Sequence, residues 1–179
     1  MPLTIWPRDT TLIGTASEGR NVLDYPLSQW AFVCVVAGAV VGLLLNIPMV
    51  TQDEGYLPAY VAAAGLTRAD PAAVSRPLAV GVHHGTALVA ALLYGAVVAV
   101  LSLVLPTAIS LNGVPLIPHV VGAAGVTAFI YYFFARVAMP RFGGSFRDDT
   151  DEIVQQWALT AFIFGTALAL FVPVLVTWM

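Results

Sequence analysis

Long apolar stretches alternate along this chain with short polar connections. The longest uncharged stretch, residues 77–135, lies between Arg76 and Arg136 and contains no Asp, Glu, Lys or Arg. As one continuous helix it would be about 90 Å long, or about three times the thickness of a bilayer's hydrocarbon core. It must therefore fold back on itself, and the pattern predicts an integral membrane protein.

Four stretches are long and apolar enough to cross a bilayer as helices. We predict an all-α fold, a polytopic four-transmembrane-helix bundle that forms one membrane domain over residues 29–179. Residues 1–28 are predicted to be a polar N-terminal tail, with Tyr25 and Trp30 anchoring the chain at the membrane interface. The predicted spans are residues 30–50, 78–105, 118–139 and 153–178.

The connections between the spans carry local signals of their own. In the first, the segment Leu57–Leu66 predicts a short interfacial helix, and Asp70 followed by Pro71 predicts a capped turn. In the second, three prolines and the pair Asn112-Gly113 predict a tight turn.

The third connection contains four acidic residues. Their spacing lacks the alternating oxygen ligands of a calcium loop, so we interpret them as the N-terminal cap of the last helix, with Asp149 and Glu152 at capping-box spacing. Pro48 and Pro173 are expected to disturb the ends of the first and last spans. The acidic residues are Asp148, Asp149, Asp151 and Glu152.

Composition narrows the class of protein further. Hydrophobic residues make up 59% of the chain and charged residues 9%, with a mean hydropathy of +0.88, which excludes a soluble domain. All seven basic residues are Arg, and the net charge of −3 with no basic patch argues against a nucleic-acid partner. Cys34 is the single cysteine, so neither a disulfide nor a thiolate zinc site is expected.

The arginines predict the orientation of the spans. Arg8 and Arg20 fall on the side of the termini, and five arginines fall on the side of the long connections. The positive-inside rule then places those connections in the cytoplasm and both termini outside the cell membrane. The five are Arg68, Arg76, Arg136, Arg141 and Arg147.

Small residues recur four apart on the spans, and they predict close helix packing. In lipid, close approach of helix backbones at small residues is a main source of packing energy. We interpret these positions as a seam inside the bundle, with a homo-oligomer or a membrane partner subunit as the alternative. The predicted packing glycines are Gly38, Gly42, Gly81, Gly85, Gly95, Gly122, Gly125 and Gly165.

His83 and His84 are the candidate intramembrane polar site, together with Asn46 of the first span. Ionisable residues inside a membrane span mark functional sites by default. Adjacent helix residues point about 100° apart, so the two imidazoles do not easily ligate one ion. The first interpretation is neutral histidines bonded to a backbone carbonyl or to Asn46. Proton relay, haem ligation and metal ligation are the alternatives.

His119 is the remaining histidine, and hairpin topology places it roughly 25–30 Å from the His83–His84 pair. Bis-histidine haem needs two imidazoles at similar depth on facing helices, so we expect no haem inside one chain. No cofactor is predicted, although a haem shared between subunits stays open.

The segments AGAVVGLLLNIPM and HHGTALVAALLYG resemble a group of small four-span archaeal membrane proteins of unassigned function. An Arg-only, Ala- and Val-rich, mildly acidic chain is similar to proteins of extreme halophiles or of organisms with GC-rich genomes. The resemblance implies a four-span fold and no particular chemistry. Because no catalytic motif is present, we predict a non-catalytic structural or accessory membrane subunit and no enzyme. A transport or ligand-binding protein that uses His83 and His84 is the alternative.

Overall fold

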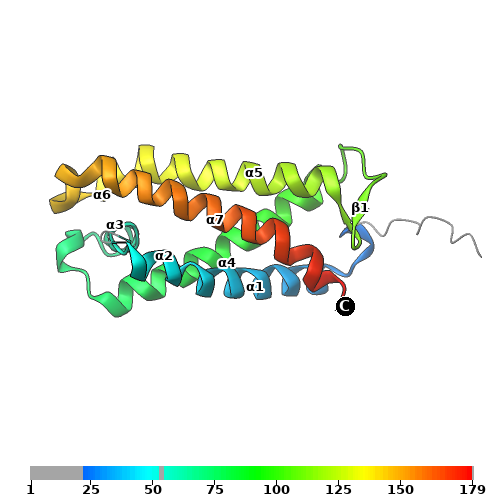
Figure 1. The fold of residues 1–179 in the computed structure, drawn as a ribbon, viewed down its shortest axis with the longest axis horizontal. Coiled ribbons are helices and arrows are strands. Elements are labelled where there is room, and N and C mark those ends of the chain that lie inside the picture. The colour runs from blue at the N-terminus through cyan, green and yellow to red at the C-terminus, as the bar shows by residue number, and fades with distance from the viewer. Residues whose placement is uncertain (1–21, 53–54, 179) are drawn as a thin grey trace, which may run out of the picture.

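The computed structural model describes residues 22–52 and 55–178, and its four long helical segments run side by side (Figure 1). Each segment is long and apolar enough to cross a membrane, which confirms the predicted all-α, four-span fold. The segments are α1 (Leu27–Leu44) continued by α2 (Asn46–Thr51), α4 (Arg76–Leu101), α5 (Leu116–Phe133) continued by η3 (Phe134–Ala138) and α6 (Met139–Phe142), and α7 (Thr150–Val176).

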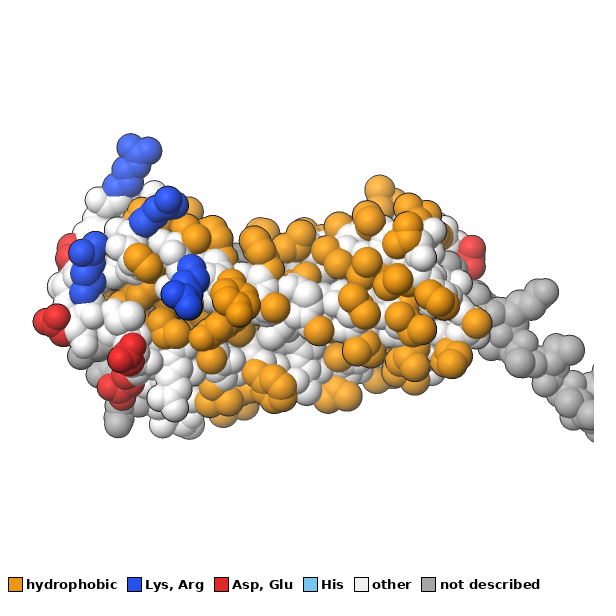
Figure 2. All heavy atoms as spheres, turned by 90° about the horizontal axis from the view of Figure 1, so that it is seen from above, with side chains coloured by type: hydrophobic (Ala, Val, Ile, Leu, Met, Phe, Trp, Pro, Cys, Tyr) orange, Lys and Arg blue, Asp and Glu red, His pale blue; other side chains and the backbone are white. Residues whose placement is uncertain are grey.

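The four segments form a ring in which each packs against two others. Helix α1 contacts α4 and α7, and α5 contacts the same two helices from the other side. Tyr94, Val98, Leu168 and Val172 are fully buried at the centre. On the face that Figure 2 shows, apolar side chains extend along the length of the bundle; the arginines and most acidic side chains gather at one end, and an acidic side chain lies at the other. An apolar exterior of this kind suits contact with lipid rather than water.

The charged end is built from the two long connections. It contains α3 (Leu57–Thr67), η2 (Pro71–Ala73) and η4 (Gly144–Asp149). Helix α3 lies across the long helices in Figure 1 and packs against α4, α6 and α7. The predicted short helix is thereby confirmed, and the bundle is closed at this end by an element that does not span it.

Asp70 joins the two connections at the charged end. As predicted, its carboxylate caps the turn at Pro71, accepting a hydrogen bond from Ala72 N at 2.9 Å. It also accepts bonds from the Ser145 hydroxyl at 2.6 Å and from Ser145 N at 3.1 Å. The Ser145 hydroxyl, followed by the Ala72 N–H, lowers the pKa of Asp70 from its ordinary value. We call this contact the Asp70–Ser145 latch.

The opposite end carries a β-hairpin between α4 and α5. Strands β1 (Ser110–Leu111) and β2 (Val114–Pro115) pair antiparallel. Asn112 and Gly113 connect them with φ of 52° and 86°, the left-handed conformations that a two-residue hairpin turn requires. The Asn-Gly turn is confirmed.

Two of the long segments change geometry near a proline. Helix α1 ends at Leu44, four residues before Pro48, because a proline cannot donate to that carbonyl and its ring clashes with it. In the third segment, Pro140 follows the π-helical turn η3, and the helix continues to Phe142. Pro140 has no N–H to donate, and the wider π-helical turn before it leaves room for the proline ring. The helix can therefore continue past the predicted end at residue 139.

Other boundaries differ by a few residues from those expected. Helix α4 begins at Arg76 and ends at Leu101, before the predicted residue 105, and α7 runs from Thr150 to Val176. The Asp149 side chain lies outside the described part of the structure, so its capping role stays a prediction. Trp30 is not an interfacial anchor: it is 4% exposed, and its Nε1 donates to the Gly95 carbonyl of α4 at 3.0 Å.

Candidate intramembrane polar site

The His83–His84 pair of α4 faces the end of α1. His83 Nε2 lies 3.3 Å from the Gly42 carbonyl oxygen and donates to it, which fixes the proton on Nε2. His84 Nε2 lies 3.5 Å from Asn46 Nδ2, a long contact in which the amide is the donor. The two imidazole rings meet edge to face, with centroids 5.1 Å apart. The predicted trio therefore comes together, each histidine reaching a different group across the helix interface.

Gly42 makes this approach of α1 and α4 possible. A Cβ at Gly42 would lie 3.1 Å from His84 Nδ1 and 3.2 Å from the Ala87 Cβ. A side chain there would push away the imidazole and the adjoining turn of α4. The glycine and the polar trio are thus parts of one contact.

Five of the eight predicted packing glycines lie where two helices nearly touch. At Gly38 a Cβ would lie 2.8 Å from Ala91 Cβ and 3.0 Å from the Ala87 carbonyl oxygen. At Gly95 it would overlap Cys34 Sγ. The other three meet His84, Val98 or Thr127 in the same way; the five are Gly38, Gly42, Gly95, Gly122 and Gly165.

Gly81, Gly85 and Gly125 do not lie at a contact of this kind. All three are exposed, and among the described residues no atom of another element lies within 4 Å of the added Cβ. The prediction that these three glycines lie in a seam inside the bundle is therefore wrong. Small residues spaced four apart lie on one face of a helix, but the spacing does not show whether that face packs against another helix or faces the lipid.

A second polar contact, centred on His119, was not predicted from the sequence. The Tyr94 hydroxyl of α4 donates to His119 Nδ1 of α5, and His119 Nε2 donates to the Ala169 carbonyl of α7 at 3.0 Å. His119 is 1% exposed, so this chain of bonds satisfies a buried imidazole and ties three helices together. The signal in the sequence is Tyr94 itself, because a tyrosine hydroxyl within an apolar span needs a hydrogen-bond partner.

The His119 contact lies far from the His83–His84 pair along the bundle. A Cβ at Gly122 would lie 2.8 Å from Val98 Cγ2, and Val98 is fifteen residues beyond His83 on α4. His119 lies one turn before Gly122, in the first turn of α5. The expected separation of roughly 25–30 Å between the histidines stays a prediction.

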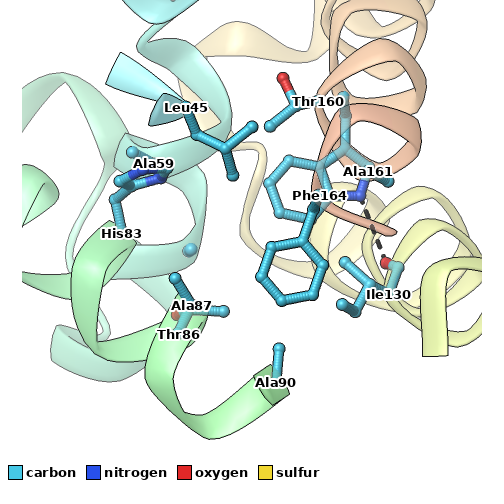
Figure 3. Close-up of a pocket in the computed structure, with 12 residues that line it drawn as sticks. Leu45, Ala59, His83, Thr86, Ala87, Ala90, Ile130, Thr160, Ala161 and Phe164 are labelled. Atoms are coloured by element: carbon cyan, nitrogen blue, oxygen red, sulfur yellow. Dashed lines mark hydrogen bonds between the residues drawn. The ribbon is translucent and has the colours of Figure 1, made fainter. Parts of the chain in front are cut away.

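Beside the His83–His84 pair lies a small chamber between the helices (Figure 3). Its volume is about 50 Å³, and His83, Thr86 and Thr160 are the polar residues on an otherwise apolar wall. In Figure 3, Leu45, Phe164 and Ile130 surround the chamber, and the dashed line marks the bond from Trp157 Nε1 to the Ile130 carbonyl at 3.2 Å.

A larger pocket of about 450 Å³ adjoins the chamber. The two share wall residues from four helices, so the chamber is the inner end of the pocket. The shared residues are Ala62, Thr86, Ala90, Ile130 and Trp157.

Across residues 22–52 and 55–178, no three His, Cys, Asp or Glu side chains gather in a way that would hold a metal ion. Asp148, Asp151 and Glu152 are exposed at the charged end. No protein family model, curated protein or solved structure matches this chain.

Proposed function

We propose that this integral membrane protein is a non-catalytic structural or accessory subunit of the cell membrane. The observation that carries the proposal is that its intramembrane histidines bond to neighbouring helices of the same chain. His83 donates to Gly42, and His119 bridges Tyr94 and Ala169. Polar groups engaged in this way hold a bundle together.

Native mass spectrometry of the protein released in mild detergent tests the proposal. We expect a mass of 18.9 kDa, a multiple of it, or that mass with a companion polypeptide, and no mass for haem or a bound metal. The variant His83→Gln/His84→Gln keeps a hydrogen-bond donor at both positions and should give the same spectrum. A haem or metal mass that disappears in this variant would contradict the proposal.

A second function is favoured by one observation: His83 forms part of the chamber wall as well as bonding to Gly42. In this second function, the His83 imidazole binds a proton or a small ligand that the protein transports across the membrane. Reconstituted vesicles with an interior pH dye separate the two functions. Proton entry that is lost in His83→Gln and kept in His119→Gln would favour transport, whereas tight vesicles favour the structural role.

Orientation belongs to the same proposal. The five arginines of the described residues lie at the charged end, in the connections or in the helical turns next to them, while Arg8 and Arg20 lie outside the described residues. We place the charged end in the cytoplasm and both termini outside. Reporter fusions after Thr177 and after Arg147 test this: an alkaline phosphatase should be active at the first site alone, and the reverse pattern would overturn the orientation.

Gly81 and Gly85 supply the surface on which a second copy or a partner subunit is expected to pack. Both are exposed on α4, where a close helix would meet no side chain. Replacing both with Leu should shift the native mass toward the single chain. An unchanged assembly would exclude this face.

A further inference from the structure

The pocket beside the chamber opens toward the surrounding lipid. Its walls come from α3, α4, α5, α6 and α7 and are almost entirely apolar. Leu66, Val89, Phe129 and Phe133 stand at its mouth, each more than half exposed on the membrane-facing surface. A volume of about 450 Å³ lies within the range of roughly 300–1,000 Å³ that is usual for ligand sites.

The length of the pocket matches one leaflet of a bilayer. On α4 it extends from Val82 to Leu93, which corresponds to about 16 Å at the rise of an α-helix. The hydrocarbon core is about 30 Å thick, so the pocket spans about half of it. It begins at the charged end, where α3 and α6 form its rim, and the chamber of about 50 Å³ at its inner side adds no room for a second chain.

Two arginines are near neighbours in sequence of the α3 and α6 residues that form that rim. Arg68 follows Leu66 at the end of α3, and Arg141 directly precedes Phe142, whose ring would lie 3.1 Å from a Cβ at Gly65. The contact brings the end of α3 against α6. Both arginines are exposed, and each lies one or two residues along the chain from a residue of the pocket wall.

The guanidinium groups of Arg68 and Arg141 are also unengaged. Neither makes a hydrogen bond, an ion pair or a ring contact with the described residues. In contrast, Arg147 donates to the Pro140 carbonyl at 3.0 Å, and Arg76 lies 4.8 Å from the centre of the Tyr56 ring. The pair at the rim is therefore available to an anion.

We infer that this pocket binds an anionic membrane lipid of the leaflet at the charged end, with one acyl or isoprenoid chain between α3, α4 and α5. Its phosphate group lies between Arg68 and Arg141. Arginine suits this role because its planar guanidinium donates two parallel bonds to phosphate oxygens. The inference does not depend on the accessory role, since a transporter or a scaffold could carry the same site.

Trp157 makes the site measurable, because its indole lines both the pocket and the chamber. Phosphatidylglycerol with brominated chains quenches a tryptophan that its chain touches. In a background with Trp6→Phe and Trp178→Phe, the remaining indole besides Trp157 is Trp30, which is buried near the opposite end. Quenching in reconstituted vesicles then reports occupancy of the pocket.

We expect brominated phosphatidylglycerol to quench Trp157 at a lower mole fraction than brominated phosphatidylcholine. Each arginine should contribute about fivefold, the ratio that corresponds to about 1 kcal/mol per basic residue at an anionic surface. Arg68→Gln/Arg141→Gln should abolish the preference. Arg76→Gln is the matched control: it removes the same charge at the start of α4, where the guanidinium group lies 4.8 Å from the centre of the Tyr56 ring and is not part of the pocket wall.

A second pair of variants tests the chain rather than the head group. Ala62→Phe fills the wall shared by pocket and chamber and should reduce quenching by both lipids, whereas Ala96→Phe on an exposed part of α4 should leave it unchanged. Equal quenching by the two lipids, unaffected by the double arginine substitution, would overturn the phosphate contact. Quenching that survives Ala62→Phe would overturn the chain site. Displacement by glycerol phosphate alone would show an anion site without a lipid chain.

Discussion

Gly38→Ala tests the closest contact between α1 and α4. The new Cβ would lie 2.8 Å from Ala91 Cβ, 3.0 Å from the Ala87 carbonyl oxygen and 3.1 Å from Leu88 Cα. Two of these three atoms belong to the backbone and cannot rotate away, so the cost falls in the upper part of the roughly 1–3 kcal/mol of overpacking. Alanine regains about 0.5–1 kcal/mol relative to a helical glycine. We expect the free energy of unfolding to fall by about 1–2 kcal/mol.

Gly125→Ala, on an exposed part of α5, is the matched control. Nothing described lies within 4 Å of its Cβ, so the helix preference acts alone and should raise the free energy of unfolding by about 0.5–1 kcal/mol. Adding Ala91→Gly to Gly38→Ala should restore only part of the lost stability, because the Ala87 carbonyl still blocks the new methyl group.

Cys34 supplies the assay. It is the single cysteine of the chain, it is 1% exposed, and its sulfur lies against Gly95 at the same seam. A thiol-reactive fluorophore therefore labels the protein only when α1 and α4 separate. If Gly38→Ala becomes labelled at the same temperature as Gly125→Ala, or at a higher one, the two helices do not approach as closely as described and this explanation is refuted.

Three further predictions concern the polar contacts and the hairpin. Tyr94→Phe leaves His119 Nδ1 without its donor, and the unfolding free energy should fall by about 1–2 kcal/mol in the thiol assay, with His119→Leu costing less in that background than alone. The lowered pKa of Asp70 means that its latch contributes fully above about pH 4 and is lost as the pH falls through the lower folded value. As the pH falls, the amide of residue 145 should therefore lose its protection against hydrogen exchange at a higher pH in Ser145→Ala than in the native protein, and equal protection profiles would contradict this. Gly113→Ala places a side chain at φ 86° and should lower the melting temperature through about 1–2 kcal/mol of strain; an unchanged melting temperature would count against the turn.

Much of the fold could be predicted because charge and length constrain membrane spans strongly. The absence of charge between Arg76 and Arg136 requires two helices and a turn, and Asn112-Gly113 marks where the turn lies. The cap at Asp70 could be predicted for a similar reason, since it depends on neighbours in the sequence. The length of an apolar stretch and the residues of a turn or cap can both be identified in one sequence.

The orientation of each helix could not be predicted in the same way. Lipid and protein interior are both apolar, so a residue such as Val89 on the outside looks like Val98 on the inside. This is why the spacing of small residues does not distinguish the exposed Gly85 from the packed Gly38, and why the Tyr94–His119 bond could not be predicted. Such contacts depend on the rotation and register of two helices, which the sequence of either one leaves undetermined.

The charge-free hairpin of α4, β1, β2 and α5 has a consequence for how the protein enters the membrane during synthesis. Moving a charged residue into the centre of a bilayer costs about 2.5–3.5 kcal/mol on the insertion scale, and residues 77–135 contain none. The turn also pairs part of its own backbone through β1 and β2. In the proposed orientation this turn is the internal connection that must be translocated. Helices α4 and α5 can therefore insert together as one helical hairpin, while every charged connection stays on the side of the ribosome.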